Sequence, residues 1–417
     1  MIELGDRRRW TIALLLGVGV LVNYFDRVNL SVSHDALVKE FGISDRVFGF
    51  LASAYNWTYA ACQLPSGMLL DRFGVRLVGF VSTLIWSIAS FAAAATRGMG
   101  GFFGARLLLG VGEAPTFPAN AKAIGYWFPP SERSFATSLF DSAAKLGSAI
   151  GVPLIGLLLL HIGWRLSFAA TGLISFAYFL LFVSVYHDPK TRSSGDVRNE
   201  RAVTMGVVFK WLAHLVKQKK VIGLAVGFGS YNYVFYLFVT WMPVYIARTF
   251  KVDLAHAFLY TGVPWLIAAA ADLTVGGWLV DALIRRGWNA DRVRRVILIG
   301  GTAMGLGILG AGNAHTPVQA MFWVTVSIGG LSAAAPVGWS VPALIAPGDT
   351  VGSVGGIMNL SSQVSGIVAP IVTGFLVNGK QSFAAAFGVA AAYLAIGIAA
   401  YFFLLGEIQM VELPREP

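Results

Sequence analysis

Charged residues are scarce in this chain of 417 residues: Asp, Glu, Lys and Arg make up 12% of it, about half the usual share in a soluble domain. Cys62 is its single cysteine, which excludes an internal disulfide framework. The sequence also lacks a P-loop, a G-x-S-x-G nucleophile elbow and histidines spaced as metal ligands. These absences argue against an enzyme, an ATP-driven pump and a metalloprotein, and we expect no cofactor.

Apolar residues, by contrast, are abundant: they make up 56% of the chain, and the mean hydropathy is +0.68. Twelve apolar stretches are each long enough to cross a hydrocarbon core of about 30 Å. The first has no small-residue cleavage pattern, so we interpret it as a spanning helix rather than a signal peptide. The sequence predicts an all-α membrane protein with twelve transmembrane helices, near residues 10–33, 46–70, 77–96, 101–128, 135–160, 167–186, 221–247, 256–280, 294–312, 318–345, 351–377 and 383–405.

One polar stretch divides these spans into six and six. It predicts an N-terminal six-helix bundle at 1–186, a cytoplasmic central loop at 187–220 and a C-terminal six-helix bundle at 221–417. The chain has 31 Lys and Arg against 21 Asp and Glu, and most basic residues outside the spans fall on the side of both termini. The positive-inside rule makes that side cytoplasmic. We therefore interpret the net charge of +10 as a topology signal and expect no nucleic-acid partner.

Two charged residues interrupt the fourth apolar stretch, Arg106 and Glu113. A charge at the centre of a bilayer costs at least about 2.5 kcal/mol, so such residues usually mark a functional path. Arg106, Gly110 and Glu113 fall on one helical stripe, with the charges roughly 10 Å apart along the axis. The first span adds Asp26 and Arg27, whose side chains point about 100° apart. A functional site and an internal ion pair that only joins helices both fit these charges.

The fifth span contains a further pair, Asp141 and Lys145, four residues apart on one helical face. Lys145 is either a second cation for the substrate or is neutralised by Asp141. Asp272, in the eighth span, has three readings: a coupling group of the second half, a partner for a basic residue, or a polar residue in a cavity. Helical spacing alone does not choose among them.

A motif recurs in the two halves. It occurs at residues 67–76 (GMLLDRFGVR) and again at 277–286 (GWLVDALIRR), with the same spacing from Gly to Asp. Asp and Arg beyond the ends of two spans can pair across the interface between bundles, as a latch that breaks when the protein changes conformation. A turn that only anchors helices at the membrane surface is the alternative. The predicted latch residues are Gly67, Asp71, Arg72, Arg76, Asp281 and Arg285.

The twelve spans, their even division and the repeated motif resemble the major facilitator superfamily, a fold of two six-helix halves around a central cavity. A narrower resemblance, to the anion:cation symporter family, rests on residues 23–30 (NYFDRVNL) and 106–118 (RLLLGVGEAPTFP), with shorter strings at 127–129, 163–165 and 241–245. That family includes bacterial sugar-acid and hexuronate permeases and the animal vesicular glutamate and lysosomal sialic-acid carriers. The resemblance covers essentially the whole chain. It implies a multi-pass protein of the bacterial inner membrane that functions as a monomer.

The resemblance also implies roles for single residues. Those matching Asp26 and Glu113 are implicated in proton coupling, and the one matching Arg27 binds the substrate carboxylate, for which a planar guanidinium is well suited. Tyr and Asn side chains can hydrogen-bond substrate hydroxyls, and a Trp face suits a sugar ring. The candidate substrate-binding residues are Tyr24, Arg27, Tyr59, Arg106, Lys145, Tyr231, Asn232, Trp339, Asn359 and Gln363.

The sequence therefore predicts a proton-coupled symporter that imports a small organic anion by alternating access, with sugar acids and hexuronates as the leading substrates. An antiporter or facilitator for other carboxylates could use the same cavity. A membrane sensor that binds the anion without moving it is a third possibility. A sensor usually needs an output domain, and the short C-terminal tail argues against one.

Overall fold

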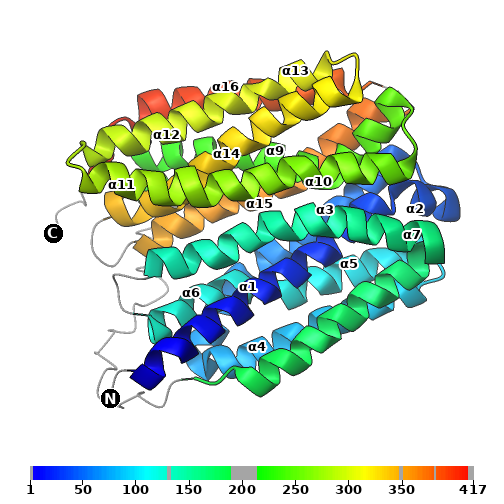
Figure 1. The fold of residues 1–417 in the computed structure, drawn as a ribbon, viewed down its shortest axis with the longest axis horizontal. Coiled ribbons are helices and arrows are strands. Elements are labelled where there is room, and N and C mark those ends of the chain that lie inside the picture. The colour runs from blue at the N-terminus through cyan, green and yellow to red at the C-terminus, as the bar shows by residue number, and fades with distance from the viewer. Residues whose placement is uncertain (1–2, 129–132, 189–213, 347–350, 380–381, 412–417) are drawn as a thin grey trace.

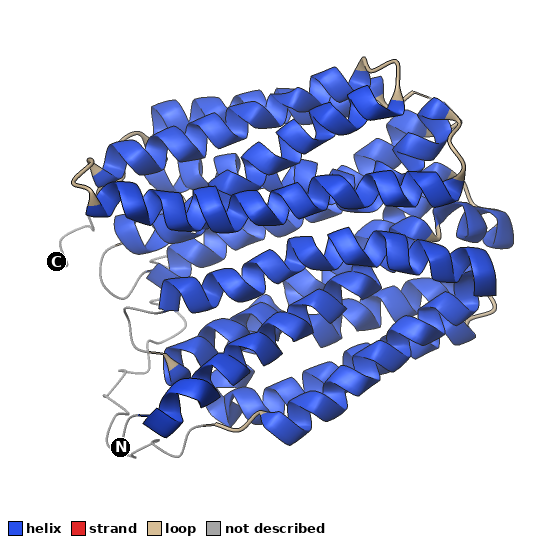
Figure 2. Cartoon of the chain, viewed as in Figure 1, coloured by secondary structure: helices blue, strands red, loops and turns tan. Residues whose placement is uncertain are grey.

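The computed structural model describes residues 3–128, 133–188, 214–346, 351–379 and 382–411. These residues form helices and loops, with no strand among them (Figure 2). The first half contains α1 (Glu3–Val32), α2 (His34–Phe41), α3 (Asp45–Ala61), α4 (Gln63–Ala95), α5 (Met99–Glu113), α6 (Thr116–Trp127) and α7 (Arg133–Val185). The second half contains α9 (Lys219–Phe250), α10 (Leu254–Ala271), the π-helix η1 (Asp272–Leu279), α11 (Val280–Arg285), α12 (Ala290–Met304), η2 (Gly305–Gly307), α13 (Ile308–Gly312), α14 (Pro317–Ile345), α15 (Val351–Val377), α16 (Ala384–Ala399) and η4 (Ala400–Leu405).

The two halves lie beside each other as two groups of long helices (Figure 1). We call the end where α1 begins and α11 meets α12 the terminal end, and the end that carries α2 the far end (Figure 1). The expected division of the chain at 187–220 falls mostly on residues outside those described, so the exact domain boundaries stay a prediction.

Nine helical segments of the described residues are long and apolar enough to cross a membrane. One of them, Ala136–Val185, accounts for two spans, because the backbone leaves the helix at Gly163 with φ +76°. Gly74 separates the second and third spans in the same way, with φ +78°, a conformation that glycine adopts at little cost. The second span joins α3 to the start of α4, and the fourth joins α5 to α6. Each of the twelve expected spans therefore has a counterpart.

Two spans are irregular where a charged residue is buried. In the fourth span α5 ends at Glu113 and α6 begins at Thr116. Pro115 lies between them, and a proline has no N–H to continue the helical hydrogen bonds. In the eighth span α10 passes into the π-helix at Asp272, and π-turns often lie at functional sites. Irregular backbone inside a membrane is tolerated where protein surrounds it.

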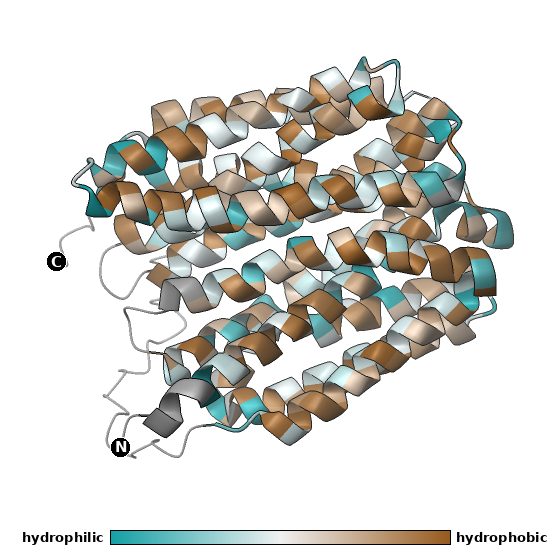
Figure 3. Cartoon of the chain, viewed as in Figure 1, coloured by the Kyte–Doolittle hydropathy of each residue, from teal (hydrophilic) through white to brown (hydrophobic). Residues whose placement is uncertain are grey.

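Hydrophobic residues predominate along the long helices, and many hydrophilic residues lie at the helix ends and loops (Figure 3). Large side chains such as Leu173 and Phe403 are 62% and 77% exposed. Exposed apolar surface on this scale fits a lipid environment.

The halves meet along two pairs of helices, α3 with α15 and α7 with α10. Near the far end the backbones of α3 and α15 almost touch. A Cβ atom added at Gly49 would lie 2.6 Å from the carbonyl oxygen of Pro370, and one added at Gly374 would lie 2.5 Å from that of Asp45. Small residues permit such close helix contact in membranes, and here they close the far end of the interface between the halves.

Candidate functional site

An ion pair joins the first and fourth spans in the middle of the first half. Arg27 Nε of α1 donates to Glu113 Oε2 of α5 at 3.1 Å, and both side chains are buried. Arg106, on the same helical stripe as Glu113, donates to the backbone oxygen of Asp26 at 3.3 Å. An internal ion pair that joins helices was one of the two readings of these charges, and the structure contains such a pair between the first and fourth spans.

Three tyrosine rings surround the Arg27 guanidinium, whose Cζ lies 4.6 Å from the ring centre of Tyr24, 4.7 Å from Tyr55 and 5.4 Å from Tyr59. Cation–π attraction holds such a cation at low cost in a buried site. Arg27 Nη2 and Glu113 Oε1 are buried without a hydrogen-bond partner. The site thus keeps part of the guanidinium fork available. Sequence reasoning missed Tyr55, although it lies one helical turn before Tyr59.

Asp26 points away from Arg27, as neighbouring positions on one helix require. Ser90 of α4 donates to Asp26 Oδ1 at 2.7 Å, and Ser175 of α7 donates to Oδ2 at 2.7 Å. Asp26 is 1% exposed, so it lies inside the first half. Neither serine was expected at the site, because nothing in the sequence distinguishes them from the other serines within the spans.

Lys145 has two acidic partners rather than one. Its Nζ lies 2.7 Å from Asp141 Oδ2 on the same helix and 2.6 Å from Asp272 Oδ2 of η1. Neither reading of Lys145 included the second carboxylate. Asp272 thus has a basic partner in the other half, which was one of its three readings.

Polar residues of the second half form a smaller network. Asn232 Nδ2 donates to Ser362 Oγ at 3.0 Å, and Gln363 Nε2 donates to Asn359 Oδ1 at 3.4 Å. Asn359 Nδ2 in turn donates to Gln63 Oε1 at 3.4 Å, a contact between the halves.

Two expected aromatic residues lie beside this network in different settings. Tyr231 is buried, with a ring 5.3 Å from that of Phe228. Trp339 is 44% exposed and meets the edge of Phe228 at 5.1 Å. The expected binding role of Trp339 stays a prediction.

The predicted latch residues lie at the terminal end. Arg72, Arg76, Asp281 and Arg285 are exposed, and Arg72 lies over the ring of Phe73 at 5.2 Å. Gly67 is in α4 with open space around it. The side chain of Asp71 lies outside what the structure describes, so pairing through it is not tested. The latch stays a prediction.

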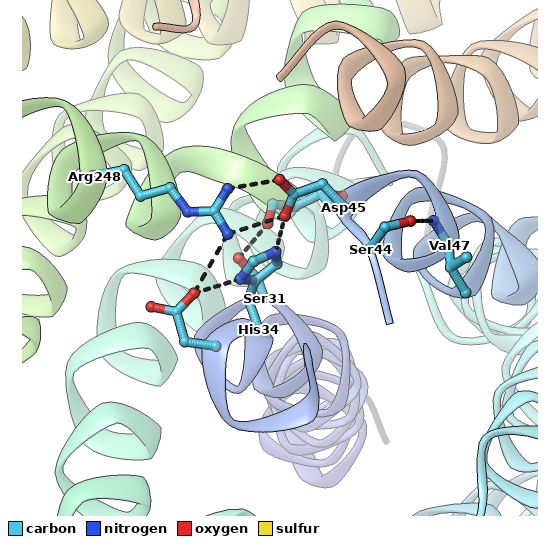
Figure 4. Close-up of polar contacts among 8 residues, drawn as sticks. Ser31, His34, Ser44, Asp45, Val47 and Arg248 are labelled. Carbon is cyan, nitrogen blue, oxygen red and sulfur yellow. Dashed lines mark hydrogen bonds and ion pairs between the residues drawn. The ribbon is translucent and has the colours of Figure 1, made fainter. Parts of the chain in front are cut away.

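A charged cluster that the sequence did not indicate joins the halves at the far end (Figure 4). Arg248 at the end of α9 donates from Nη1 to Asp45 Oδ2 at 2.8 Å and from Nη2 to Asp45 Oδ1 at 2.9 Å. His34 Nε2 lies 3.0 Å from Asp45 Oδ1, and His34 Nδ1 lies 2.7 Å from Asp35 Oδ1. We call these four residues the far-end seal. Each charge also suits its helix, with Asp45 in the first turn of α3 and Arg248 in the last turn of α9.

The seal favours ionised carboxylates. Burial raises the pKa of Asp45, but hydrogen bonds from His34 and Arg248 and the Arg248 charge outweigh it, and the pKa falls well below its usual range. A hydrogen bond with His34 is the main cause that lowers the pKa of Asp35, although burial opposes it. Both carboxylates therefore stay charged at neutral pH and hold the far end closed.

These features together define a class of protein. Two six-span halves are closed against each other at one end, as alternating access to a solute site between them requires. Buried ion pairs lie within and between these halves. The profile of the Major Facilitator Superfamily matches residues 16–289, and the chain belongs to this superfamily. It is therefore a multi-pass membrane transporter and not an enzyme.

Curated relatives match the chain over nearly its whole length. The uncharacterized transporter YybO of Bacillus subtilis is 37% identical over 416 residues, which cover 97% of this chain and 96% of the relative. A D-galactonate transporter of Escherichia coli is 30% identical over 423 residues, 97% of each chain. The probable galactarate/D-glucarate transporter GarP of Escherichia coli is 29% identical over 436 residues, 99% of this chain and 98% of the relative. The chain is thus related to bacterial sugar-acid transporters, consistent with the anion:cation symporter family.

Solved structures show the same fold at low sequence identity. A D-xylose–proton symporter matches with a TM-score of 0.75 and 16% identity, over 96% of this chain and 98% of the other. A bacterial homologue of the human lysosomal transporter Spinster, in an inward-facing conformation, matches with a TM-score of 0.74 and 17% identity, over 95% and 97%. These likenesses confirm the expected fold.

Proposed function

We propose that the chain is a proton-coupled symporter that imports a sugar acid or a related small organic anion. The observation that carries this proposal is the Arg27–Glu113 pair in its tyrosine cage, where the cation keeps Nη2 without a partner. A planar guanidinium binds carboxylates through two parallel hydrogen bonds. A substrate carboxylate that takes this fork competes with Glu113 for Arg27.

Proton coupling follows from that competition. When the substrate displaces Glu113, a charged carboxylate would remain in a buried site without its cation, which is strongly unfavourable. A proton on Glu113 removes that charge, so substrate and proton bind together. Asp26 is the second proton-coupling candidate of the first half, and a proton there would weaken its contacts with Ser90 and Ser175 and so alter how α4 and α7 pack against α1.

The names of the relatives support the substrate class. The relatives include a D-galactonate transporter, a probable galactarate/D-glucarate transporter and a probable L-galactonate transporter. Each of these sugar acids combines one or two carboxylates with several hydroxyl groups. The substrate carboxylate can bind the cations Arg27, Arg106 and Lys145. The substrate hydroxyl groups and carbon skeleton can meet the hydrogen-bonding groups and the aromatic face of the remaining candidate residues, which are Tyr24, Tyr59, Tyr231, Asn232, Trp339, Asn359 and Gln363.

The topology completes the proposal. With both termini in the cytoplasm, as the basic loops predict, the far end faces outward and the seal closes the outer side. The conformation is then closed to the outside, and the transporter acts as a monomer in the plasma membrane with the anion and protons as its partners.

Glu113→Gln tests the mechanism in proteoliposomes. Uphill uptake of D-galactonate driven by a pH gradient should be lost, while counterflow exchange of the same substrate should remain measurable. Arg165→Ala is a suitable control, because Arg165 is exposed and its partner Glu40 lies in the same half. Accumulation at the wild-type level by Glu113→Gln would end the assignment of Glu113.

The same assay separates the alternatives. An antiporter would require a counter-substrate inside the vesicles, a facilitator would never exceed equilibrium, and a sensor would bind without exchange. The competition between Glu113 and the substrate carboxylate for Arg27 favours the symporter, because it links protonation of the buried Glu113 carboxylate to binding of the substrate carboxylate.

A further inference from the structure

A second charged centre lies between the halves, separate from the Arg27–Glu113 pair. Lys145 Nζ lies between Asp141 Oδ2 and Asp272 Oδ2, at 2.7 Å and 2.6 Å. The Lys145 and Asp272 side chains are 3% and 0% exposed. One ammonium is thus shared by two carboxylates, and the centre carries one excess negative charge when all three groups are ionised.

The two carboxylates differ in how they depend on Lys145. Asp141 and Lys145 are one turn apart on α7, so they stay together when the halves move. Asp272 belongs to the other half, at the first residue of the π-helix. Apart from the ammonium, neither Asp272 oxygen has a hydrogen-bond donor among the described residues. Asp141 is more exposed, at 17%. Asp272 is therefore the carboxylate that is left without a paired cation when the Lys145 ammonium binds another anion.

Among the described residues, Lys145 is the only cation paired with Asp272. On the side of the first half, α7 contributes Asp141 and Lys145, and Tyr24 of α1 lies within electrostatic range of both. On the other side, α9 contributes Tyr231. α14 packs against η1 and contains no titratable residue. The titratable groups of α10 and α11 are two or more turns away along the axis, at His256, Tyr260, Asp281 and Arg285. Within the part of the second half that the structure describes, Asp272 is the only buried charged residue.

We propose that Asp272 is a second proton-binding site, which takes up a proton when an oxygen of the bound substrate displaces it from Lys145. This inference rests on the proposed function and adds a proton to it. A proton from solvent forms an O–H bond with the Asp272 carboxylate, while the ammonium stays charged and the substrate oxygen takes its place at Nζ. Protonated Asp272 is neutral, so it can remain buried without a cation. Asp141 stays beside Lys145 on the same helix throughout.

The number of protons moved with each substrate tests this assignment. In proteoliposomes that carry D-galactonate, the reversal potential gives the proton-to-substrate ratio. Asp272→Asn should lower that ratio by one and retain counterflow exchange. Where one proton is linked to binding, the affinity of the wild type for D-galactonate should weaken by up to about tenfold for each unit by which the pH rises. Asp272→Asn should remove the part of this pH dependence that comes from Asp272. Asp141→Asn is the matched control and should keep the wild-type ratio.

An unchanged ratio and an unchanged pH dependence in Asp272→Asn would overturn the proposal. Asp272→Glu keeps a titratable group and should keep the ratio, so it serves if the amide variant is poorly folded. If Asp272→Glu lowers the proton-to-substrate ratio as much as Asp272→Asn does, the ratio depends on the geometry of the Asp272 side chain and not on a titratable group there. That result would also refute the proton-binding role.

A substrate-free measurement separates this inference from the proposed function. In Lys145→Gln the ammonium is absent, so Asp272 should hold a proton near neutral pH and give an infrared band of a protonated carboxyl group. That band should be absent from the double variant Lys145→Gln/Asp272→Asn. If the band behaves so while no sugar acid is transported, the proposed function fails and the proton site stands. If the band is the same in both variants, the proton site fails whatever the substrate.

Discussion

Replacing Arg248 with alanine should open the far end of the transporter. The Arg248 guanidinium makes two hydrogen bonds to Asp45, at 2.8 Å and 2.9 Å, and they join α9 of the second half to α3 of the first. Hydrogen bonds to charged groups are worth about 1.5–3 kcal/mol. We take that range for the pair as a whole, because the Arg248 side chain is 25% exposed and solvent weakens it. At about 1.4 kcal/mol per factor of ten, the ratio of closed to open protein should fall roughly ten- to a hundredfold.

Distances between spin labels on the two halves measure this change. Lys39 of α2 and Ala385 of α16 are both exposed, and both lie toward the far end. Cysteines at these positions, in a Cys62→Ser background, report the separation of the halves by pulsed electron resonance. The unmodified seal should give one short-distance population, and Arg248→Ala should add a longer one.

Arg165→Ala is the matched control for this experiment. Arg165 Nη1 donates to Glu40 Oε1 at 2.8 Å, a similar ion pair at the same end, but both residues belong to the first half. It should leave the distance distribution unchanged. An unchanged distribution in Arg248→Ala, or an equal change in both variants, would refute the view that the seal holds the halves together.

Three further outcomes follow from the structure. The pKa of Asp45 and of Asp35 lies below the ordinary value of 3.8 in the sealed state, so their contribution to the stability of the closed far end is complete above about pH 4 and is lost as the pH falls through the lowered values. The distance between the spin labels should therefore lengthen only below about pH 4. Lengthening already at pH 6 would contradict this. Gly49→Val should disfavour the closed far end, because its Cβ would meet a carbonyl oxygen at 2.6 Å and overpacking costs about 1–3 kcal/mol. Gly104→Ala is the control, because Gly104 has open space around it, and it should not change the distance between the spin labels. Arg27→Lys should weaken D-galactonate binding by on the order of 1.5–3 kcal/mol, because the charge remains and the fork is lost; calorimetric titration with unchanged affinity would make Arg27 a structural residue.

The structure also changes the expectation for a double variant at Lys145. If Lys145 and Asp141 only neutralised each other, removing both charges should restore folding and transport. Asp272 now remains as a buried carboxylate without its cation in Lys145→Ala/Asp141→Asn. Because Asp272 should take up a proton when its cation is absent, the double variant should recover folding without Asp272→Asn, but not transport, since Lys145 is a candidate substrate cation. Equal expression of the double variant and of the triple variant with Asp272→Asn, together with uptake by both, checks this.

The spans and their charges could be predicted from the sequence. A membrane-spanning helix needs only a local run of apolar residues, so the twelve stretches identified their helices even where Pro115 breaks the fourth. The buried charges stood out for the same reason, because Arg27, Glu113 and Asp272 interrupt apolar runs. The residues around them did not stand out, since Tyr55 and Ser90 are common types within spans and acquire their role from what lies opposite.

Which charges meet between different spans was decided by the tertiary structure alone. Helical spacing fixes the face on which a side chain lies, and it correctly separated Asp26 from Arg27. It does not fix the rotation of one helix against another. Arg27 and Glu113 are 86 residues apart, and Asp45 and Arg248 are 203 apart, so their contacts depend on how whole helices pack. Burial in a membrane is a local property that adds up along the chain, whereas an ion pair between spans requires two distant segments to be placed to within an ångström.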